Sequence, residues 1–399
     1  MKSKNPSSIS MEIFQTIAIF ILALFIVSCG SDVQLTGGPL FSTVMTVTNP
    51  LQGTTPQGSL TTDGSTIFGR THDGGIYNGG VSFSMLPDGS NYNVIHDFGN
   101  TGDSTGPRHD SMMVIGDELY GMTMGDGGSD LGAIFSHTTR GSDYRMLHSF
   151  QSSATDGSTP HSCPRLNPLD GFLYGLTELG GTSNDGTLFK ISTDGNIFNI
   201  LHSFSSATDG SHTHGSVTFN GTTLYGMNLE GGAHNKGTIF SYNTANDTFT
   251  VLHSFTGLSD DGALPIHCNV VVVNNVLYGT TTSGGAHDDG TIWSMNLDGT
   301  NFRAIYSFTG SSDGSCPEGS LMYDSNTAKF YGMTSGLKGG GSTLFSITTS
   351  GTFATLHNFE TGLTCEDNVI LLNGRLWGMA LNSNPAGSWI LFSYRLPGN

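Results

Sequence analysis

Residues 216–255 read SVTFNGTTLYGMNLEGGAHNKGTIFSYNTANDTFTVLHSF, one complete copy of a unit that recurs along the chain. Four short segments, at 216–219, 223–227, 237–240 and 250–255, are rich in β-branched and aromatic residues. Asn220-Gly221 and Gly231-Gly232 supply turn residues between the first three segments. This pattern predicts four short antiparallel strands.

A Tyr-Gly pair, or a close variant, marks the second segment of every unit. The pairs are Phe68-Gly69, Tyr120-Gly121, Tyr174-Gly175, Tyr225-Gly226, Tyr278-Gly279, Tyr331-Gly332 and Trp377-Gly378. Subtracting successive positions gives steps of 52, 54, 51, 53, 53 and 46 residues. Such a period is typical of a repeat architecture. We expect the aromatic side chain to pack between units and the glycine to permit a close backbone approach.

Seven units of four strands predict an all-β fold, a seven-bladed β-propeller of four-stranded antiparallel blades. The last unit, 369–395, holds only three strands, and a lone strand at 42–47 precedes the first unit. Pairing this N-terminal strand with the C-terminal blade completes the seventh sheet and closes the ring. The expected single domain, 42–399, has blades at about 57–98, 109–150, 161–204, 214–255, 267–308, 318–359 and 366–396 plus 42–48.

The N-terminus is predicted to be an export signal. A basic start precedes an apolar run at 17–27, which is too short to span a bilayer comfortably. Ile26-Val27-Ser28-Cys29 resembles the bacterial lipobox, which implies a signal peptide at 1–28, lipidation of Cys29 and a tether at 29–41. We therefore expect a lipoprotein of the outer membrane or cell surface. The alternative is an ordinary signal peptide or an N-terminal anchor.

The chain is strongly acidic, with 14 lysines and arginines against 32 aspartates and glutamates and a formal charge of −18. A surface of this charge repels phosphate backbones, so we expect no nucleic-acid partner. Cations and neutral sugars are compatible with it.

Four cysteines follow the lipobox, at Cys163, Cys268, Cys316 and Cys365. Export to an oxidising compartment permits disulfides, and four thiols allow three full pairings. A bridge from Cys316 to Cys365, in adjacent units, is one candidate.

The repeated motifs resemble those of the GloVer-type (choice-of-anchor) tandem-repeat family of exported bacterial proteins. Its units carry Leu-Tyr-Gly, a Gly-Gly loop, Gly-Thr-(Ile/Val)-Phe, Leu-His-Ser-Phe and Asp-Gly-x-x-Pro. Here these motifs are Leu277-Tyr278-Gly279, Gly284-Gly285, Gly290-Thr291-Ile292-Trp293, Leu252-His253-Ser254-Phe255 and Asp261-Gly262-Ala263-Leu264-Pro265. The resemblance covers nearly everything after residue 55. It implies a propeller on the cell envelope and supplies no catalytic residues.

One column of polar residues is expected to ring a mouth of the central channel. Two positions before the first strand of each unit stand Gln57, His109, His161, His214, His267, Glu318 and Glu366. Because the first strand of a propeller blade is innermost, these are the predicted ligand-binding residues. His109, His161, His214 and His267 are candidate metal ligands, since imidazole suits Zn²⁺, Mn²⁺ and similar ions. The alternative is that the position only favours side chains that stack at the channel rim.

A second histidine column lies inside the fourth strands. Its members are His96, His148, His202, His253 and His357, with Tyr306 in the remaining unit. Asp103, Asp156, Asp209, Asp261 and Asp313 follow seven or eight residues later in five units. We expect hydrogen bonds that tie each outer strand to the following loop, since buried polar groups need partners.

These features favour a lipid-anchored, monomeric binding module, with no catalytic residue and no organic cofactor. The expected ligand is a glycan or another extracellular polymer, and lipidated Cys29 makes the membrane a partner. One alternative is a metal-dependent envelope polysaccharide lyase or hydrolase that uses the His/Glu ring. A second alternative is a scaffold for protein partners.

Overall fold

The computed structural model describes residues 40–107, 109, 111–126, 131–339, 341–383 and 386–397. The predicted signal peptide, Cys29 and nearly all of the tether lie outside these residues. The chain divides into two units, Met1–Leu40 and Phe41–Asn399, and the second is a seven-bladed β-propeller, which confirms the predicted fold class. In the part described, the one helix is the short 3-10 helix η1 (Pro50–Gln52). No helix among these residues has the length and apolar character needed to cross a membrane.

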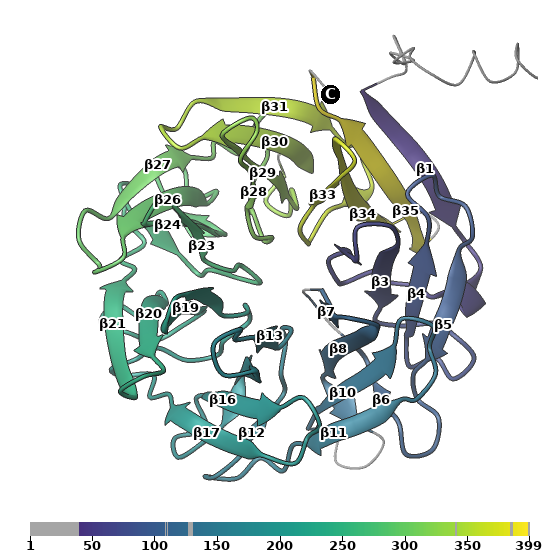
Figure 1. The fold of residues 1–399 in the computed structure, drawn as a ribbon. Helices are drawn as coiled ribbons and strands as arrows, with labels where there is room; N and C mark the ends of the chain where they lie inside the picture. Colours follow the sequence, from purple (N-terminus) through teal and green to yellow (C-terminus); the bar gives the residue numbers. More distant parts are fainter. Residues whose placement is uncertain are drawn as a thin grey trace, which may run out of the picture. The chain divides into compact units, whose positions relative to one another are not determined.

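Each blade is an antiparallel sheet whose strands succeed one another from the channel outward (Figure 1). The innermost strands are β2 (Thr61–Thr62), β7 (Met113–Ile115), β13 (Arg165–Leu166), β18 (Thr218–Asn220), β23 (Val271–Val273), β28 (Met322–Asp324) and β33 (Ile370–Leu372). The second strands are β3 (Ile67–Thr71), β8 (Glu118–Thr123), β14 (Phe172–Thr177), β19 (Thr223–Asn228), β24 (Val276–Thr281), β29 (Lys329–Thr334) and β34 (Arg375–Ser383).

The outer half of each blade is formed by its third and fourth strands. The third strands are β4 (Val81–Met85), β10 (Ala133–Thr138), β16 (Thr187–Ser192), β20 (Thr238–Asn243), β26 (Thr291–Asn296), β30 (Thr343–Thr348) and β35 (Ala386–Arg395). The outermost strands are β5 (Asn93–Asp97), β11 (Arg145–Ser149), β17 (Phe198–Ser203), β21 (Thr248–Ser254), β27 (Arg303–Ser307), β31 (Phe353–Asn358) and β1 (Phe41–Val47).

Short two-residue strands brace the loops that lead into the blades. The pairs are β6 (Ser104–Thr105) with β9 (Gly125–Asp126), β12 (Gly157–Ser158) with β15 (Leu179–Gly180), and β22 (Gly262–Ala263) with β25 (Ser283–Gly284). Strand β32 (Leu363–Thr364) pairs with the end of β34 in the same way. These ladders brace the loops that carry His109, His161, His267 and Glu366.

The N-terminal strand closes the ring, as predicted. β1 pairs antiparallel with β35 from Phe41 opposite Tyr394 to Val47 opposite Trp389. Figure 1 shows the purple β1 lying beside the yellow β35. Val47 and Trp389 are both buried in one apolar cluster, so the closure is a packed seam and more than a row of backbone hydrogen bonds.

The Tyr-Gly pair has a packing explanation. Tyr225 of β19 lies in a buried cluster with Leu277 and Trp293 of the next blade, so the aromatic residue packs between blades as expected. The glycine differs from expectation, because its close neighbour is an aromatic ring and not a backbone. A Cβ on Gly226 would lie 2.5 Å from Cζ of Phe240, the phenylalanine of the adjacent third strand. The glycine thus makes room for the blade's central aromatic ring.

The second histidine column joins outer strands to loops, which confirms the predicted hydrogen bonds. The measured pairs are His96–Asp103 (2.8 Å), His148–Asp156 (3.0 Å), His202–Asp209 (3.0 Å), His253–Asp261 (3.2 Å) and Tyr306–Asp313 (2.9 Å). Each imidazole also stacks on an aromatic ring of the next blade. His202, for example, stacks on Phe249 with centroids 3.8 Å apart. The column therefore stabilises both the loop and the interface between blades.

Candidate functional site

Each predicted ring residue lies in the loop that leads into an innermost strand. His161 lies between β12 and β13, and His267 between β22 and β23. His267 itself has a positive φ of 54°, and two positions before His161 the residue Thr159 has a φ of 55°. These left-handed residues turn the chain toward the channel, and the short ladders hold the turn in place.

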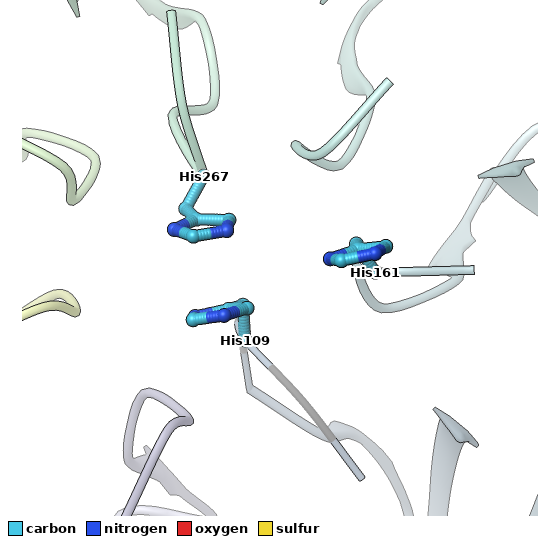
Figure 2. Close-up of side chains that lie close together, drawn as sticks. All are labelled: His109, His161 and His267. Atoms are coloured by element: carbon cyan, nitrogen blue, oxygen red, sulfur yellow. The ribbon is translucent and has the colours of Figure 1, made fainter. Parts of the chain in front are cut away.

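The structure brings the four histidines of blades two to five together with their rings nearly parallel. The centroids of His109 and His267 are 3.4 Å apart, and those of His161 and His214 are 4.1 Å apart. A distance of 5.2 Å between His214 and His267 connects the two pairs. Figure 2 shows His109, His161 and His267 reaching from separate loops toward a common space. His109 and His161 are about 95% buried, so the cluster is an interior feature of the mouth.

Glu178 joins this cluster, although the sequence analysis did not select it. Its Oε2 lies 2.9 Å from Nε2 of His161, and its Oε1 lies 3.6 Å from Nε2 of His214. Burial acts to raise the pKa of Glu178, but the hydrogen bond with His161 and the nearby imidazole of His214 outweigh it and hold that pKa well below its usual range. Glu178 is therefore an anion at neutral pH.

Glu178 could have been found from the repeat. The residue four positions after each Tyr-Gly aromatic is His72, Met124, Glu178, Leu229, Thr282, Ser335 or Leu381. Glu178 is the one carboxylate in that column. The sequence does not show that the end of β14, the second strand of blade three, lies beside the ring loops of blades three and four.

The carboxylates of blades six and seven form the opposite part of the mouth. Glu318 is buried, and desolvation together with the nearby charge of Glu366 raises the pKa of Glu318 to about 7. Asp367, the neighbour of Glu366, places Oδ1 4.0 Å from Nδ1 of His109. Gln57 holds the equivalent place in blade one, and its buried Oε1 has no hydrogen-bond partner among the described residues.

A hydrogen-bonded belt that was not predicted lies two positions after the ring. Its seven residues are Ser59, Ser111, Cys163, Ser216, Asn269, Ser320 and Asn368. Backbone N–H groups donate to side chains of the next blade, from Cys163 to Ser216 (3.0 Å), Ser216 to Asn269 (2.5 Å), Asn269 to Ser320 (2.7 Å), Ser320 to Asn368, and Asn368 to Ser59 (3.1 Å). The belt fixes the inner ends of the blades directly beside the ring.

The channel has a cavity of about 550 Å³ lined by the innermost strands. Its walls include belt residues and apolar side chains such as Leu60, Val217 and Leu321, with Arg165 as a charged lining residue. None of the seven ring residues lines this cavity. The histidine cluster is therefore not part of the lining of this cavity.

The cysteines do not form the Cys316 to Cys365 bridge considered above. No disulfide joins Cys163, Cys268, Cys316 and Cys365 in the part of the chain described, and all four side chains are buried. Burial raises the pKa of Cys268 to about 12, so this thiol is neutral and unreactive. The thiols serve as small packing residues; Sγ of Cys268, for instance, donates to the carbonyl of Ile266 at 2.8 Å.

Two groups in the mouth have the donor atoms for a metal ion. His109, His161 and His267 form one group, and His161, Glu178 and His214 form the other. In each group the nearest ligand atoms all lie within 4.8 Å of one another. His161 belongs to both groups, so a single ion bound through His161 would be held by one group or by the other.

Fold and mouth together define a class of protein, a seven-bladed β-propeller with imidazoles and carboxylates clustered at one channel mouth. The chain belongs to the Gloeobacter/Verrucomicrobia repeat family, whose sequence profile matches residues 27–222 and 166–392. The resemblance inferred from the motifs is thereby confirmed. None of the curated proteins matches the sequence.

Solved structures share the fold at low sequence identity. An oligogalacturonate lyase in complex with manganese has a TM-score of 0.58 at 11% identity, over 88% of this chain and 90% of that one. A prolyl endopeptidase structure has a TM-score of 0.52 at 9% identity, and this chain, matched over 88% of its length, spans 51% of it. Likeness at this level establishes the propeller fold alone.

Proposed function

We propose that this protein is a binding module of the bacterial cell envelope, tethered through lipidated Cys29, which binds a glycan or similar hydroxyl-rich polymer at the channel mouth. The observation that carries the proposal is the convergence of four parallel imidazoles from consecutive blades on one mouth. Imidazole nitrogens can form hydrogen bonds with the hydroxyl groups of sugars, and carboxylates such as Glu178 accept hydrogen bonds from them.

Rigidity and charge support this reading. The loops that carry the ring are held by ladders and by the belt, so little conformational entropy is lost when a ligand binds. The formal charge of −18 favours neutral polymers or cations over polyanions. The oligogalacturonate lyase with the same fold offers a precedent for a carbohydrate ligand, by fold analogy only.

A glycan array followed by affinity measurement tests the proposal. The double variant His161→Ala with His214→Ala removes one stacked pair of imidazoles. We expect its affinity for the glycan to fall about tenfold or more, and a tenfold fall is equivalent to about 1.4 kcal/mol. His234→Ala, in an exposed loop away from the ring positions, is the matched control and should bind normally. Absence of glycan binding by the wild type, or equal affinity of the double variant, would refute the proposal.

One observation favours a second candidate, an envelope polysaccharide lyase or hydrolase. Glu318 has its pKa raised to about 7 by burial and by Glu366, and a carboxyl with such a pKa suits general acid or base catalysis at neutral pH. Chain-length analysis of a bound polymer after incubation distinguishes the candidates, because a binding module leaves the polymer intact.

A further inference from the structure

Two imidazoles in the mouth direct the same ring nitrogen at one carboxylate. Nε2 of His161 and Nε2 of His214 approach the two oxygens of Glu178 at 2.9 and 3.6 Å. The three side chains come from the loops before β13 and β18 and from the residue that follows β14. They therefore form a preassembled set of two nitrogen donors and one carboxylate, built by two adjacent blades.

His214 points to a ligand that is not part of the protein. Both of its ring nitrogens are buried, and neither has a hydrogen-bond partner among the described residues. The 3.6 Å approach of Nε2 to Glu178 is too long for a hydrogen bond. Buried polar atoms normally have partners, so an unpartnered imidazole nitrogen facing a carboxylate marks a place where an ion would complete its bonding.

The donor chemistry selects the class of ion. Two imidazoles and a carboxylate are the protein ligands typical of an open zinc site, and neutral imidazole also suits neighbouring first-row ions. Mg²⁺ and Ca²⁺ prefer oxygen ligands throughout and are disfavoured here. Tetrahedral coordination at the usual Zn–N distance places ligand atoms about 3.3 Å apart. The nearest donors of this group lie within 4.8 Å, so closure needs a shift of about 1.5 Å at most.

Ring rotation can provide that shift. The rings of His161 and His214 are parallel to within 2°, and a lone pair lies in the plane of its ring, so at least one ring must turn to meet a shared ion. The terminal torsion of a histidine side chain has a broad energy profile, which makes such a turn inexpensive. The side chains of Glu178 and His214 are 22% and 13% exposed, so the group is partly open to solvent.

Charge favours this group over its neighbour. The carboxylate of Glu178 offsets part of the charge of a divalent cation, and the acidic protein attracts cations from solution. The alternative group of His109, His161 and His267 consists of three imidazoles and has no carboxylate.

We propose that His161, His214 and Glu178 bind one divalent transition-metal ion of the zinc class at the channel mouth, with an open coordination position toward solvent. This site goes beyond the proposed binding of a glycan and stands whether or not a glycan binds. In a metal-loaded protein the open position faces the surface where the polymer is proposed to sit.

Titration of the chelator-treated full-length protein with Zn²⁺ and with Co²⁺ tests the site. Calorimetry should give one ion per chain, and bound Co²⁺ should show the visible absorption of a tetrahedral complex. His214→Ala and Glu178→Gln should each weaken binding at least tenfold, with glutamine preserving the size of the side chain. His234→Ala serves as the control for loss of an exposed histidine. Circular dichroism of every variant verifies that it is folded.

The outcomes separate the two proposals. Absence of stoichiometric binding by the wild type overturns the metal site, as does full binding by a folded Glu178→Gln variant. If His109→Ala and His267→Ala lose metal binding while Glu178→Gln retains it, the ion is bound by His109, His161 and His267. That result also overturns the proposed site. Glycan affinity measured with excess chelator tests the polymer proposal independently, because that measurement contains no metal.

Discussion

The pKa of Glu318 is set by the surroundings of its side chain. Its carboxyl is 7% exposed, and both burial and the charge of Glu366 oppose its ionisation, which raises the pKa from 4.5 to about 7. Ser335 moderates the shift by a hydrogen bond to the carboxylate. A buried carboxyl group with a raised pKa makes the stability of the folded protein depend on pH.

The direction of that dependence follows from the raised pKa. Below about pH 4.5 the folded and unfolded chains both hold the proton on Glu318. Between pH 4.5 and 7 the unfolded chain releases it first, so the folded state loses up to about 3 kcal/mol as pH rises. Glu318→Gln cannot ionise. The free energy of unfolding of this variant relative to wild type should therefore increase by up to about 3 kcal/mol from pH 4.5 to pH 8.

Chemical denaturation at both pH values measures this difference, and the exposed Glu360→Gln provides a matched control. A pH-independent difference for Glu318→Gln would show that Glu318 has an ordinary pKa. The comparison between variants cancels the contributions of all other titrating groups.

The sequence identified Glu318 and the histidines because they occupy equivalent positions in successive repeats. It missed Glu178 because that residue belongs to a different column, and its contact with His161 and His214 depends on how the end of β14 lies beside two loops. Which rings stack on which was equally hidden, since the 3.4 Å approach of His109 to His267 joins blades two and five, which are not neighbours in the ring. Equivalent positions in the repeats predict which side chains lie at the channel mouth. The directions of those side chains, which the sequence does not give, determine which of them are in contact.

Among the elements, the outermost strands carry a shared irregularity that accounts for the second histidine column. In β21 the register against β20 shifts between Ile239 and Phe240, so Leu252 is an extra residue immediately before His253. The equivalent shift occurs in every blade, including the seventh, where it falls between Thr43 and Met45. A β-bulge turns the following side chain out of the regular pleat. Here it directs the imidazole toward the loop aspartate.

Blade six suggests how this link can be tested in blade three. Tyr306 replaces the histidine there and still bonds Asp313 at 2.9 Å while stacking on Phe353 at 4.1 Å. His202→Tyr should therefore keep both contacts, and its cost should stay below about 0.5 kcal/mol. His202→Phe keeps the stack on Phe249 but leaves Asp209 without its partner, which should cost about 1–2 kcal/mol.

Equilibrium unfolding of the two variants decides the matter. Equal losses for tyrosine and phenylalanine would show that the bond to Asp209 contributes nothing. The His-to-Asp spacing of seven or eight residues made this link predictable, whereas the bulge that directs the imidazole has no signature in the spacing.

At the scale of the whole molecule, the fold was predictable because seven repeats carry the same pattern of strands and turns. The count of strands also predicted that β1 would complete the last blade, since three strands remained at one end of the chain and one at the other. The belt of Ser59, Ser216, Asn269 and their equivalents was not predictable. Serine and asparagine are common in loops, and only the closed ring places each of them next to the backbone of the preceding blade.

Ring closure depends on the seam between β1 and β35, which joins residues more than 300 positions apart, so the entropy lost in bringing the ends together must be offset by packing. Val47 is 2% exposed and contributes to that packing with Trp389.

Val47→Asp would bury an unpaired charge in the seam and should lower the free energy of unfolding by more than about 3 kcal/mol. Thr46→Asp, on the exposed side of the same strand, should cost less than about 1 kcal/mol. Limited proteolysis should then cleave Val47→Asp within residues 40–60 first, because an opened seam releases β1 from the seventh blade. If both variants unfold at the same denaturant concentration, the seam does not determine the stability of the ring.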